Sequence, residues 1–532
     1  MTEKRADVLF EESSSDNGDF KNVSNRTTIA ASIREVDGLV VLGMSQDDLD
    51  FYEGFTPQKR LRLNHKIDVR MLPLLAALYL VSSLDRANIG NAKIEGLATD
   101  LKLSGVEYNT ALAVFFISYI LFNFPSNVIL KQIKRPSWYL GASAITFGFI
   151  MSMHGVVQSF TGLALCRFLL GVFEAGFFPA AIYLASAYYL PRDLSVRIGA
   201  FYCTGAISGA FSGLLAAAIT QMDGVGGYEG WRWIFIIEGL GTVVIGILTV
   251  FFLIDLPSSS TGWLDPDELR FLEVQRKLKQ GGLNADGSDV EGGERGFQWY
   301  QLKMVLTDWK NCLLAFCLAC QAVGFYGVKF NLPTLTKSMG FTSTNAQLLS
   351  VPPYILAGIT CVLIPHLSDR YGARAAFIIP CFFAMALGFA VVMAFDGDLH
   401  GSHVAPAYIM MCIAIVGLFS VCPLILTWGA NNTSPAGRRA MISSLLTSIA
   451  NFGGIAGSFM FLDSEAPVYH TGYGLAVATG ASGVIGSSIL YFSWRRLNKR
   501  RANIPEEQVR EKYTDMELLR LGDRSPLFRY QL

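Results

Sequence analysis

The sequence predicts an all-α fold: a polytopic membrane protein with twelve transmembrane helices in two six-helix bundles. Of its 532 residues, 52% are hydrophobic and only 16% are charged, whereas soluble domains carry about 25% charged residues. Apolar stretches of about 20 residues, the length that crosses a bilayer, recur along most of the chain. A polar stretch from about Asp255 to Gln301 separates six of them from the other six.

The apolar stretches define the individual spans. Glycine and proline occur inside several of them, as membrane helices tolerate. We expect spans at residues 69–90, 109–130, 138–158, 162–189, 196–220, 232–255, 311–332, 346–367, 375–395, 406–428, 438–461 and 473–494.

The regions between and beyond the spans complete the domain organisation. The linker contains a helix start, with Asp265 as N-cap and Glu268 completing a capping box. Two six-helix halves with matching basic turns are typical of transporters built from parallel repeats. We expect a disordered cytosolic N-terminal tail (1–68), an N-terminal bundle (69–255), a cytosolic linker with a short helix (256–305), a C-terminal bundle (306–495) and a cytosolic C-terminal tail (496–532).

Lysine and arginine predict the orientation. With twelve spans, both termini lie on the same side of the membrane. Lysine and arginine are more frequent in the short loops on that side than in the opposite loops, and basic runs flank the first and last spans. The excess of positive charge indicates the cytosolic side. We therefore expect a multi-pass protein of the plasma membrane with both termini in the cytosol.

Four charged residues interrupt the apolar spans: Asp85, Arg86, Arg167 and Glu174. An ionisable group inside a bilayer costs about 2.5–3.5 kcal/mol on insertion scales. Arg167 and Glu174 are seven residues apart, so they share a helix face, with Gly171 between them leaving room for a small solute. The alternative is an internal ion-pair network that only joins helices.

Asp85 and Arg86 are adjacent, so their side chains point about 100° apart around the helix. One can face the fourth span while the other faces a central cavity, and Asn88 continues the polar face. The alternative is a pair near the membrane surface that reaches water.

Several strings in the sequence then indicate a family. They are LDRANIGNAKIEGL, CRFLLGVFEAGFFPA, WRWIFIIEGL, LPTLTKSMGF, WGANNTSPAGRRA and ANFGGIAG. Together they resemble the fungal allantoate-permease branch of the major facilitator superfamily, within the anion:cation symporter group, over residues 66–494. Members of that branch carry carboxylates such as allantoate, nicotinate, pantothenate or biotin, usually with protons.

The resemblance implies roles for the four buried charges. Asp85 and Glu174 would accept protons, and Arg86 and Arg167 would hold the substrate carboxylate. Arginine suits this role because its fork of donors matches a carboxylate. The turn after the second span lacks the acidic residue of the superfamily's glycine–aspartate–arginine pattern, which leaves the gating role of that turn open.

Further residues are weaker candidates. The two basic turns contain the predicted gating residues Lys131, Asp369, Arg370 and Arg374. Asn88, Tyr326, Trp428 and Asn451 are candidates to line the substrate site, with core packing as the alternative for the last two. Lys329 is expected at the outer end of the seventh span, either guiding an anion or reaching the interface. Arg232 and Glu238 are expected to anchor or pair helices near the outer end of the sixth span.

These observations predict a secondary active transporter that imports a small organic anion with protons by alternating access. The alternatives are an exporter of a carboxylate-bearing metabolite and a nutrient sensor that does not transport. Six histidines without clustering and no nucleophile elbow disfavour an enzyme. We expect no cofactor, no metal and no nucleic acid, and a monomer in the lipid bilayer.

Overall fold

The computed structural model describes residues 34–36, 39–41, 46–133, 135–189, 191–259, 262–280, 299–398, 401–434, 436–513, 518 and 521–532. The chain divides into two compact units. Unit 1 comprises Met1–Phe55 and Glu273–Glu294. Its described elements are helix α1 (Gln46–Gly54) and an antiparallel pair of strands, β1 (Arg34–Val36) and β2 (Leu39–Val41).

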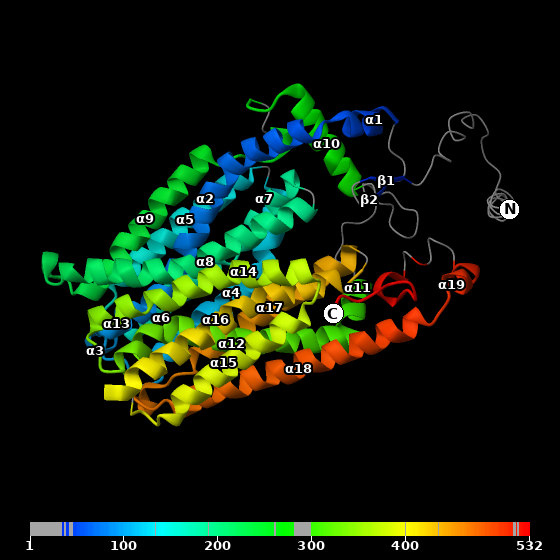
Figure 1. The fold of residues 1–532 in the computed structure, drawn as a ribbon. Helices are drawn as coiled ribbons and strands as arrows, with labels where there is room; N and C mark the ends of the chain where they lie inside the picture. The colour runs from blue at the N-terminus through cyan, green and yellow to red at the C-terminus, as the bar shows by residue number, and fades with distance from the viewer. Residues whose placement is uncertain are drawn as a thin grey trace. The chain divides into compact units, whose positions relative to one another are not determined.

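Unit 2 comprises Thr56–Leu272 and Arg295–Leu532 and contains the apolar helices (Figure 1). Its first half contains α2 (Pro57–Ala92), η1 (Lys93–Leu97), α3 (Ala98–Asp100), α4 (Glu107–Gln132), α5 (Pro136–Met153), η2 (His154–Val156), α6 (Phe160–Glu174), α7 (Phe177–Tyr188), α8 (Pro191–Ile219), η3 (Thr220–Met222), η4 (Val225–Gly227) and α9 (Gly230–Phe252). The linker contains η5 (Pro257–Ser259) and α10 (Pro266–Gln280), which continues into unit 1.

The second half of unit 2 is also helical. It contains α11 (Trp299–Thr307), α12 (Trp309–Lys337), α13 (Ser343–Leu349), α14 (Val351–Tyr371), α15 (Ala375–Ala394), η6 (Gly401–His403), α16 (Val404–Asn431), α17 (Ala436–Ser458), η7 (Asp463–Glu465), α18 (His470–Ala502), α19 (Glu506–Lys512) and η8 (Gly522–Arg524).

The all-α membrane fold predicted from the sequence is confirmed, and each of the twelve predicted spans coincides with a helix or a helix pair. Ten helical segments among the described residues are long and apolar enough to cross a membrane. The other two predicted spans coincide with α8 and α17. Helix α2 begins at Pro57, inside the segment that the sequence assigns to the N-terminal tail.

The fourth span is interrupted directly after Glu174. Helix α6 ends at Glu174 and α7 begins at Phe177. Pro179 has no backbone N–H, so it cannot donate to the carbonyl of Ala175 one turn earlier. The Asn123 side chain of α4 donates to that carbonyl instead, at 3.1 Å. The break therefore places the Glu174 carboxylate at a helix end inside the bundle.

The two halves meet along three helix pairs. Helix α2 packs against α12, α4 against α17, and α8 against α14, and Figure 1 shows α8 beside α14. Polar contacts between the halves gather at the end that carries α3, α13 and η7. These contacts include Lys93–Asp463 (2.6 Å), Asn109 to the Ser458 carbonyl (2.6 Å), Gln347–Glu95 (2.9 Å) and Lys337 to the Ile94 carbonyl (2.9 Å).

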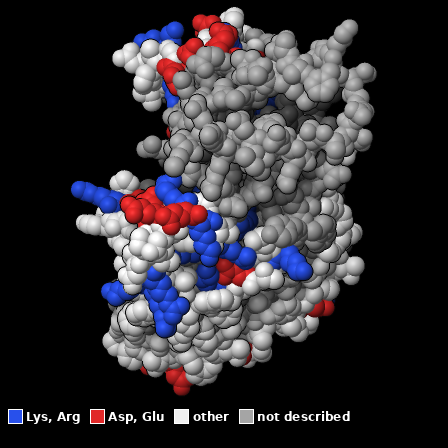
Figure 2. Space-filling model, turned by 90° about the vertical axis from the view of Figure 1, so that its right-hand side faces the viewer, with Lys and Arg blue, Asp and Glu red and all other residues white. Residues whose placement is uncertain are grey.

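The opposite end of unit 2, which carries the start of α2 and the end of α18, is rich in lysine and arginine. Figure 2 shows these basic side chains gathered on the described surface. Lys499, Arg500 and Arg501 fill the last turn of α18. This is the end that the sequence assigns to the cytosol.

The C-terminal segment packs into this basic end of unit 2. Arg438 of α17 forms a buried ion pair with Asp523 at 2.6 Å. The ring of Tyr530 stacks on Trp494, with centroids 5.7 Å apart. The Gln531 carbonyl accepts a hydrogen bond from the Trp428 indole at 3.0 Å. Residues 521–532 therefore join α16, α17 and α18.

Arg438→Ala should release this segment, because breaking a buried ion pair costs about 3–5 kcal/mol. We expect a lower melting temperature and faster trypsin cleavage after Arg524. The control is Arg510→Ala, which removes the ion pair between Arg510 and Glu506. These side chains are 54% and 61% exposed, and exposed ion pairs contribute little to stability. Equal cleavage rates in the two variants would contradict the docking of this segment.

Candidate functional site

A small polar cavity lies between the two halves of unit 2. Its volume is about 90 Å³, smaller than the roughly 300–1,000 Å³ of typical ligand pockets. It is lined by Tyr79, Ser83, Arg86, Gly205, Gln321, Ala322, Phe325, Tyr326, Lys329, Cys361, Phe419, Cys422, Pro423 and Ala450. We call it the central cavity; both halves contribute side chains to it.

Arg86 and Glu174 form the ion pair beside the central cavity. The Arg86 Nε and Nη2 atoms donate to Glu174 Oε1 at 2.7 and 2.5 Å. Ser82, one turn earlier on α2, donates to the same oxygen at 2.5 Å. The Arg86 guanidinium also lies over the rings of Phe115 and Tyr119, 5.5 and 5.1 Å from their centroids. This pairing leaves Glu174 Oε2 buried without a hydrogen-bond partner.

Lys329 of α12 is the second cation of the cavity. Its Nζ atom donates to Ser83 Oγ at 2.8 Å, and its side chain is buried. The expectation that Lys329 lies at the outer end of its span is wrong, because α12 continues to Lys337 and Lys329 points into the bundle. Among the described residues, Lys329 forms no ion pair within 4.0 Å, so its charge is available to an anion in the cavity.

Aromatic rings form the remaining walls of the cavity. The rings of Phe325 and Phe419 have centroids 4.7 Å apart, and Lys329 Nζ lies 5.9 Å from the Phe325 centroid. The ring of Tyr79 stacks on Phe201 at 4.4 Å. Flat apolar walls beside two cations suit a planar anion.

Asp85 and Arg167 lie behind the cavity, inside the first half. Both are buried, and neither is among the residues that line the cavity. Both Asp85 carboxylate oxygens, and the Nε and Nη2 atoms of Arg167, are buried without hydrogen-bond partners. The two side chains form no ion pair within 4.0 Å in the described structure. Of the four charges predicted to meet, only Arg86 and Glu174 form an ion pair.

Asn88 also faces into the first half. Its Nδ2 atom donates to the buried carboxylate of Glu238 on α9, and its Oδ1 atom accepts from Ser212 Oγ at 2.9 Å. Glu238 is 6% exposed, and its bond to Asn88 joins α9 to α2, as expected of a helix-pairing residue. Arg232, six residues earlier on α9, pairs with Glu229 at 2.5 Å and donates to the carbonyls of Gly155 and Val157.

The six ionisable side chains in the middle of the bundle are balanced in charge. Among the described residues they are the acids Asp85, Glu174 and Glu238 and the bases Arg86, Arg167 and Lys329. Four of them were recognised from the sequence as a matched set. Lys329 and Glu238 extend that set by one base and one acid.

The room expected at Gly171 for a solute is filled by α4. A Cβ atom on Gly171 would lie 2.1 Å from Ser118 Oγ and 2.4 Å from the Phe115 carbonyl oxygen. Glycine at this position therefore allows α6 to approach the backbone of α4, and the expectation of a solute gap there is wrong.

The other predicted site residues lie in different places. Tyr326 lines the central cavity. Trp428 is buried and donates to the C-terminal segment, and Asn451 is partly buried on α17 outside the cavity lining. Asp369 and Arg374 form an ion pair, and Arg370 is exposed. Lys131 lies at the end of α4, and its side chain lies outside the described part of the structure.

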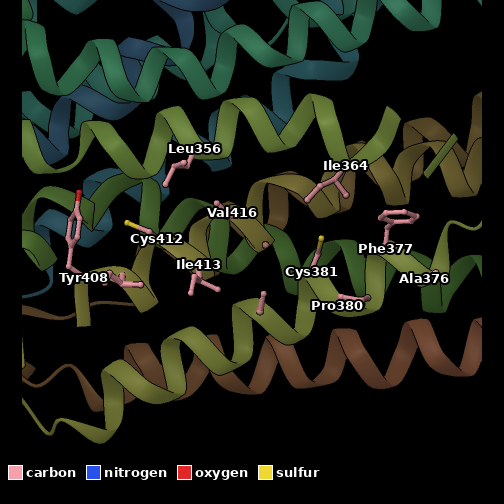
Figure 3. Close-up of a pocket in the computed structure, with 13 residues that line it drawn as sticks. Leu356, Ile364, Ala376, Phe377, Pro380, Cys381, Tyr408, Cys412, Ile413 and Val416 are labelled. Atoms are coloured by element: carbon pink, nitrogen blue, oxygen red, sulfur yellow. The ribbon is translucent and has the colours of Figure 1, made fainter. Parts of the chain in front are cut away.

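A larger pocket of about 650 Å³ lies between α14, α15 and α16. Figure 3 shows the side chains that line it, which include Leu356, Phe377 and Cys412. No charged side chain lines it, and Ile409 and Ile413 on its rim are exposed. A groove of this kind faces the acyl chains of a bilayer, so it is a poor candidate for an anion site.

Two helical halves that meet around a charged central cavity are the architecture of membrane transporters built from two repeats. The chain belongs to the Major Facilitator Superfamily, which it matches over residues 75–458. It is 32% identical to the MFS-type transporter cnsO of Penicillium expansum, over 90% of this chain and 92% of that one. It is 26% identical to the high-affinity nicotinic acid transporter of Saccharomyces cerevisiae, over 99% and 94%.

A solved structure shares the fold. It is a bacterial homologue of the human lysosomal transporter Spinster in an inward-facing, occupied conformation, with a TM-score of 0.59 and 17% identity over 80% of this chain and 96% of that one. The family and these similar proteins are transporters.

Gly171→Ala should weaken the packing of α6 on α4, because overfilling a packed site costs about 1–3 kcal/mol. We expect a lower melting temperature of the purified protein. Gly241→Ala on α9 is the matched control, since a Cβ atom there meets no atom within 4 Å and alanine favours the helix by about 1 kcal/mol. A Gly171→Ala protein as stable as the control would contradict the close α4–α6 contact.

Proposed function

We propose that the chain is a proton-coupled symporter of a small organic carboxylate, of nicotinate-, allantoate- or pantothenate-like chemistry. The charge balance carries this proposal: of the three acids and three bases named above, all are buried except Arg86, whose side chain is 13% exposed at the central cavity. A bound monocarboxylate adds one negative charge that has no partner in a low-dielectric site. Uptake of one proton by a buried carboxylate restores neutrality, so anion and proton bind together.

Arg86 and Lys329 are the proposed ligands of the carboxylate. Both line the central cavity, and Arg86 offers a planar fork of donors. The aromatic walls favour a flat substrate. The similarity to a nicotinic acid transporter supports a carboxylate, and the sequence strings support the allantoate-permease branch.

Asp85 and Glu174 are the proposed proton acceptors. A proton on Glu174 weakens its bond to Arg86, because the neutral acid no longer attracts the guanidinium. Arg86 is then free to bind the substrate. Arg167 lies behind the cavity and stabilises the ionised forms of Asp85 and Glu174. It thereby positions these two carboxylates.

Substrate entry and release require the two halves to rock, since the cavity of about 90 Å³ is too small for a typical ligand. We propose that the end joined by Lys93–Asp463 faces outward, with both termini in the cytosol and the protein in the plasma membrane. Asp369 and Arg374 would then act at the cytosolic gate.

Lys329→Gln should raise the apparent KM for the carboxylate by about tenfold or more, because a hydrogen bond to a charged group contributes about 1.5–3 kcal/mol. The measurement is uptake of labelled monocarboxylates by purified protein in liposomes with an inward proton gradient. Lys329→Arg should keep most of the affinity. Lys303→Gln, at an exposed position of α11, is the control.

The ranking of variants tests the placement of the carboxylate. We expect Arg86→Gln and Lys329→Gln to weaken affinity more than Arg167→Gln. A larger loss from Arg167→Gln would move the carboxylate site behind the cavity and overturn this assignment.

Glu174→Gln should abolish accumulation driven by the proton gradient while sparing counterflow exchange, because glutamine cannot release a proton. Both rates are measured on the same proteoliposomes, with Glu507→Gln on the exposed face of α19 as the control. Intact gradient-driven accumulation in the Glu174→Gln protein would remove Glu174 from the coupling.

A further inference from the structure

A continuous chain of hydrogen bonds runs inside the first half and ends on Glu238. Asn91 Nδ2 donates to Ser212 Oγ at 2.7 Å, Ser212 Oγ donates to Asn88 Oδ1 at 2.9 Å, and Asn88 Nδ2 donates to Glu238 Oε2. Asn88 and Asn91 are three residues apart, so they share one face of α2. The chain joins α2, α8 and α9, and none of its four residues lines the central cavity.

Acceptor atoms in this region outnumber the donors that reach them. Both oxygens of Asp85, Oε1 of Glu238 and Oδ1 of Asn91 are buried without hydrogen-bond partners. Asp85 and Glu238 are 0% and 6% exposed. Unpaired buried acceptors are costly. A proton taken up by Glu238 gives its unpaired oxygen a hydrogen to donate and removes one negative charge.

Glu238 faces no base within ion-pair distance among the described residues. Asp85 of α2 is buried without a hydrogen-bond partner. Other titratable side chains on α9 and on the elements packed against it have partners of their own. His154 of η2 contacts the Ile150 carbonyl through Nδ1 at 2.9 Å, Lys93 and Glu95 of η1 bond to Asp463 and Gln347, and Arg232 of α9 bonds to Glu229.

Glu174 differs from Glu238 in this respect, because it pairs with Arg86. Glu238 is bonded to an uncharged amide instead, so no base within 4.0 Å stabilises its ionised form among the described residues.

We propose that Glu238 is a further proton-binding site of the transporter, separate from the cavity that binds the anion. The inference rests on the proposed function and deepens it. When the anion binds at Arg86 and Lys329, the accompanying proton is distributed over the buried carboxylates, and Glu238 is one of the groups that hold it. Asn88 connects Glu238 to α2, the helix that also carries Arg86. When the proton leaves, the carboxylates regain their full negative charge and the anion is released.

The first test needs no substrate. Purified full-length protein in lipid is titrated with acid and base while infrared spectroscopy records the carbonyl band of protonated carboxyl groups. We expect Glu238→Gln to remove the signal of one buried carboxyl group. The control is Glu229→Gln on the same helix; Glu229 is 48% exposed. Glu238→Asp, which keeps the acid, should retain the signal and shows that the site tolerates substitution.

The second test measures coupling with labelled nicotinate as the probe, or with another monocarboxylate that the liposome assay identifies. Glu238→Gln should reduce gradient-driven accumulation by about tenfold, a typical coupling effect, while counterflow exchange and apparent KM stay within about twofold. Glu238→Asp should restore accumulation.

The outcomes separate the two proposals. An unchanged infrared titration in a folded Glu238→Gln protein overturns the proton site without touching the anion site. If the Glu238→Gln protein loses the infrared signal but still transports the same number of protons per carboxylate, Glu238 is a permanently protonated acid. That result overturns its role in coupling. Loss of nicotinate binding in Lys329→Gln with a normal infrared titration supports the anion site independently.

Discussion

The cost of an uncompensated charge in the bilayer interior is the constraint that organises this protein. Ionised side chains there persist only when opposite charges and hydrogen bonds surround them. The bundle meets this constraint with three acids and three bases in its middle. Because the set is balanced without substrate, any added anion must bring a compensating positive charge. Substrate binding and proton binding are thereby joined by electrostatics.

These charges lie at two different faces of helix α2. Arg86 faces the central cavity and Glu174, whereas Asp85 and Asn88 face the interior of the first half. The two faces belong to the same helix, so a change of charge on one face alters the electrostatic potential at the other. The break between α6 and α7 supports this arrangement, since it places Glu174 at a helix end where Ser82 and Arg86 both reach it.

Much of the fold could be predicted from the sequence. Apolar stretches of sufficient length predicted twelve spans, because a membrane helix must bury its backbone polar groups within itself. Each coincides with a helix or a helix pair, and ten helical segments of the described residues are long and apolar enough to cross a membrane. The interruption after Glu174 was not predicted, although Pro179 is a visible signal for it. The long course of α12 was also missed, and this is why Lys329 was expected at an interface.

The candidate site was only partly predictable. Asp85, Arg86, Arg167 and Glu174 were recognisable because charges inside apolar runs are rare. Which of them pair depends on helix rotation and on contacts between distant segments, which periodicity does not determine. Gly171 illustrates this point: spacing indicated a gap, and the structure fills it with α4. Glu238 lies inside the predicted sixth span, but no sequence pattern linked it to the four charges of the first and fourth spans.

The most direct measurement of the central claim is the number of protons taken up when the carboxylate binds. Isothermal titration calorimetry of the purified protein, in buffers that differ in ionisation enthalpy, gives this number without a membrane gradient. The charge balance predicts uptake of about one proton per bound monocarboxylate. Binding enthalpies that do not depend on the buffer would mean that no proton accompanies the anion and would contradict the account.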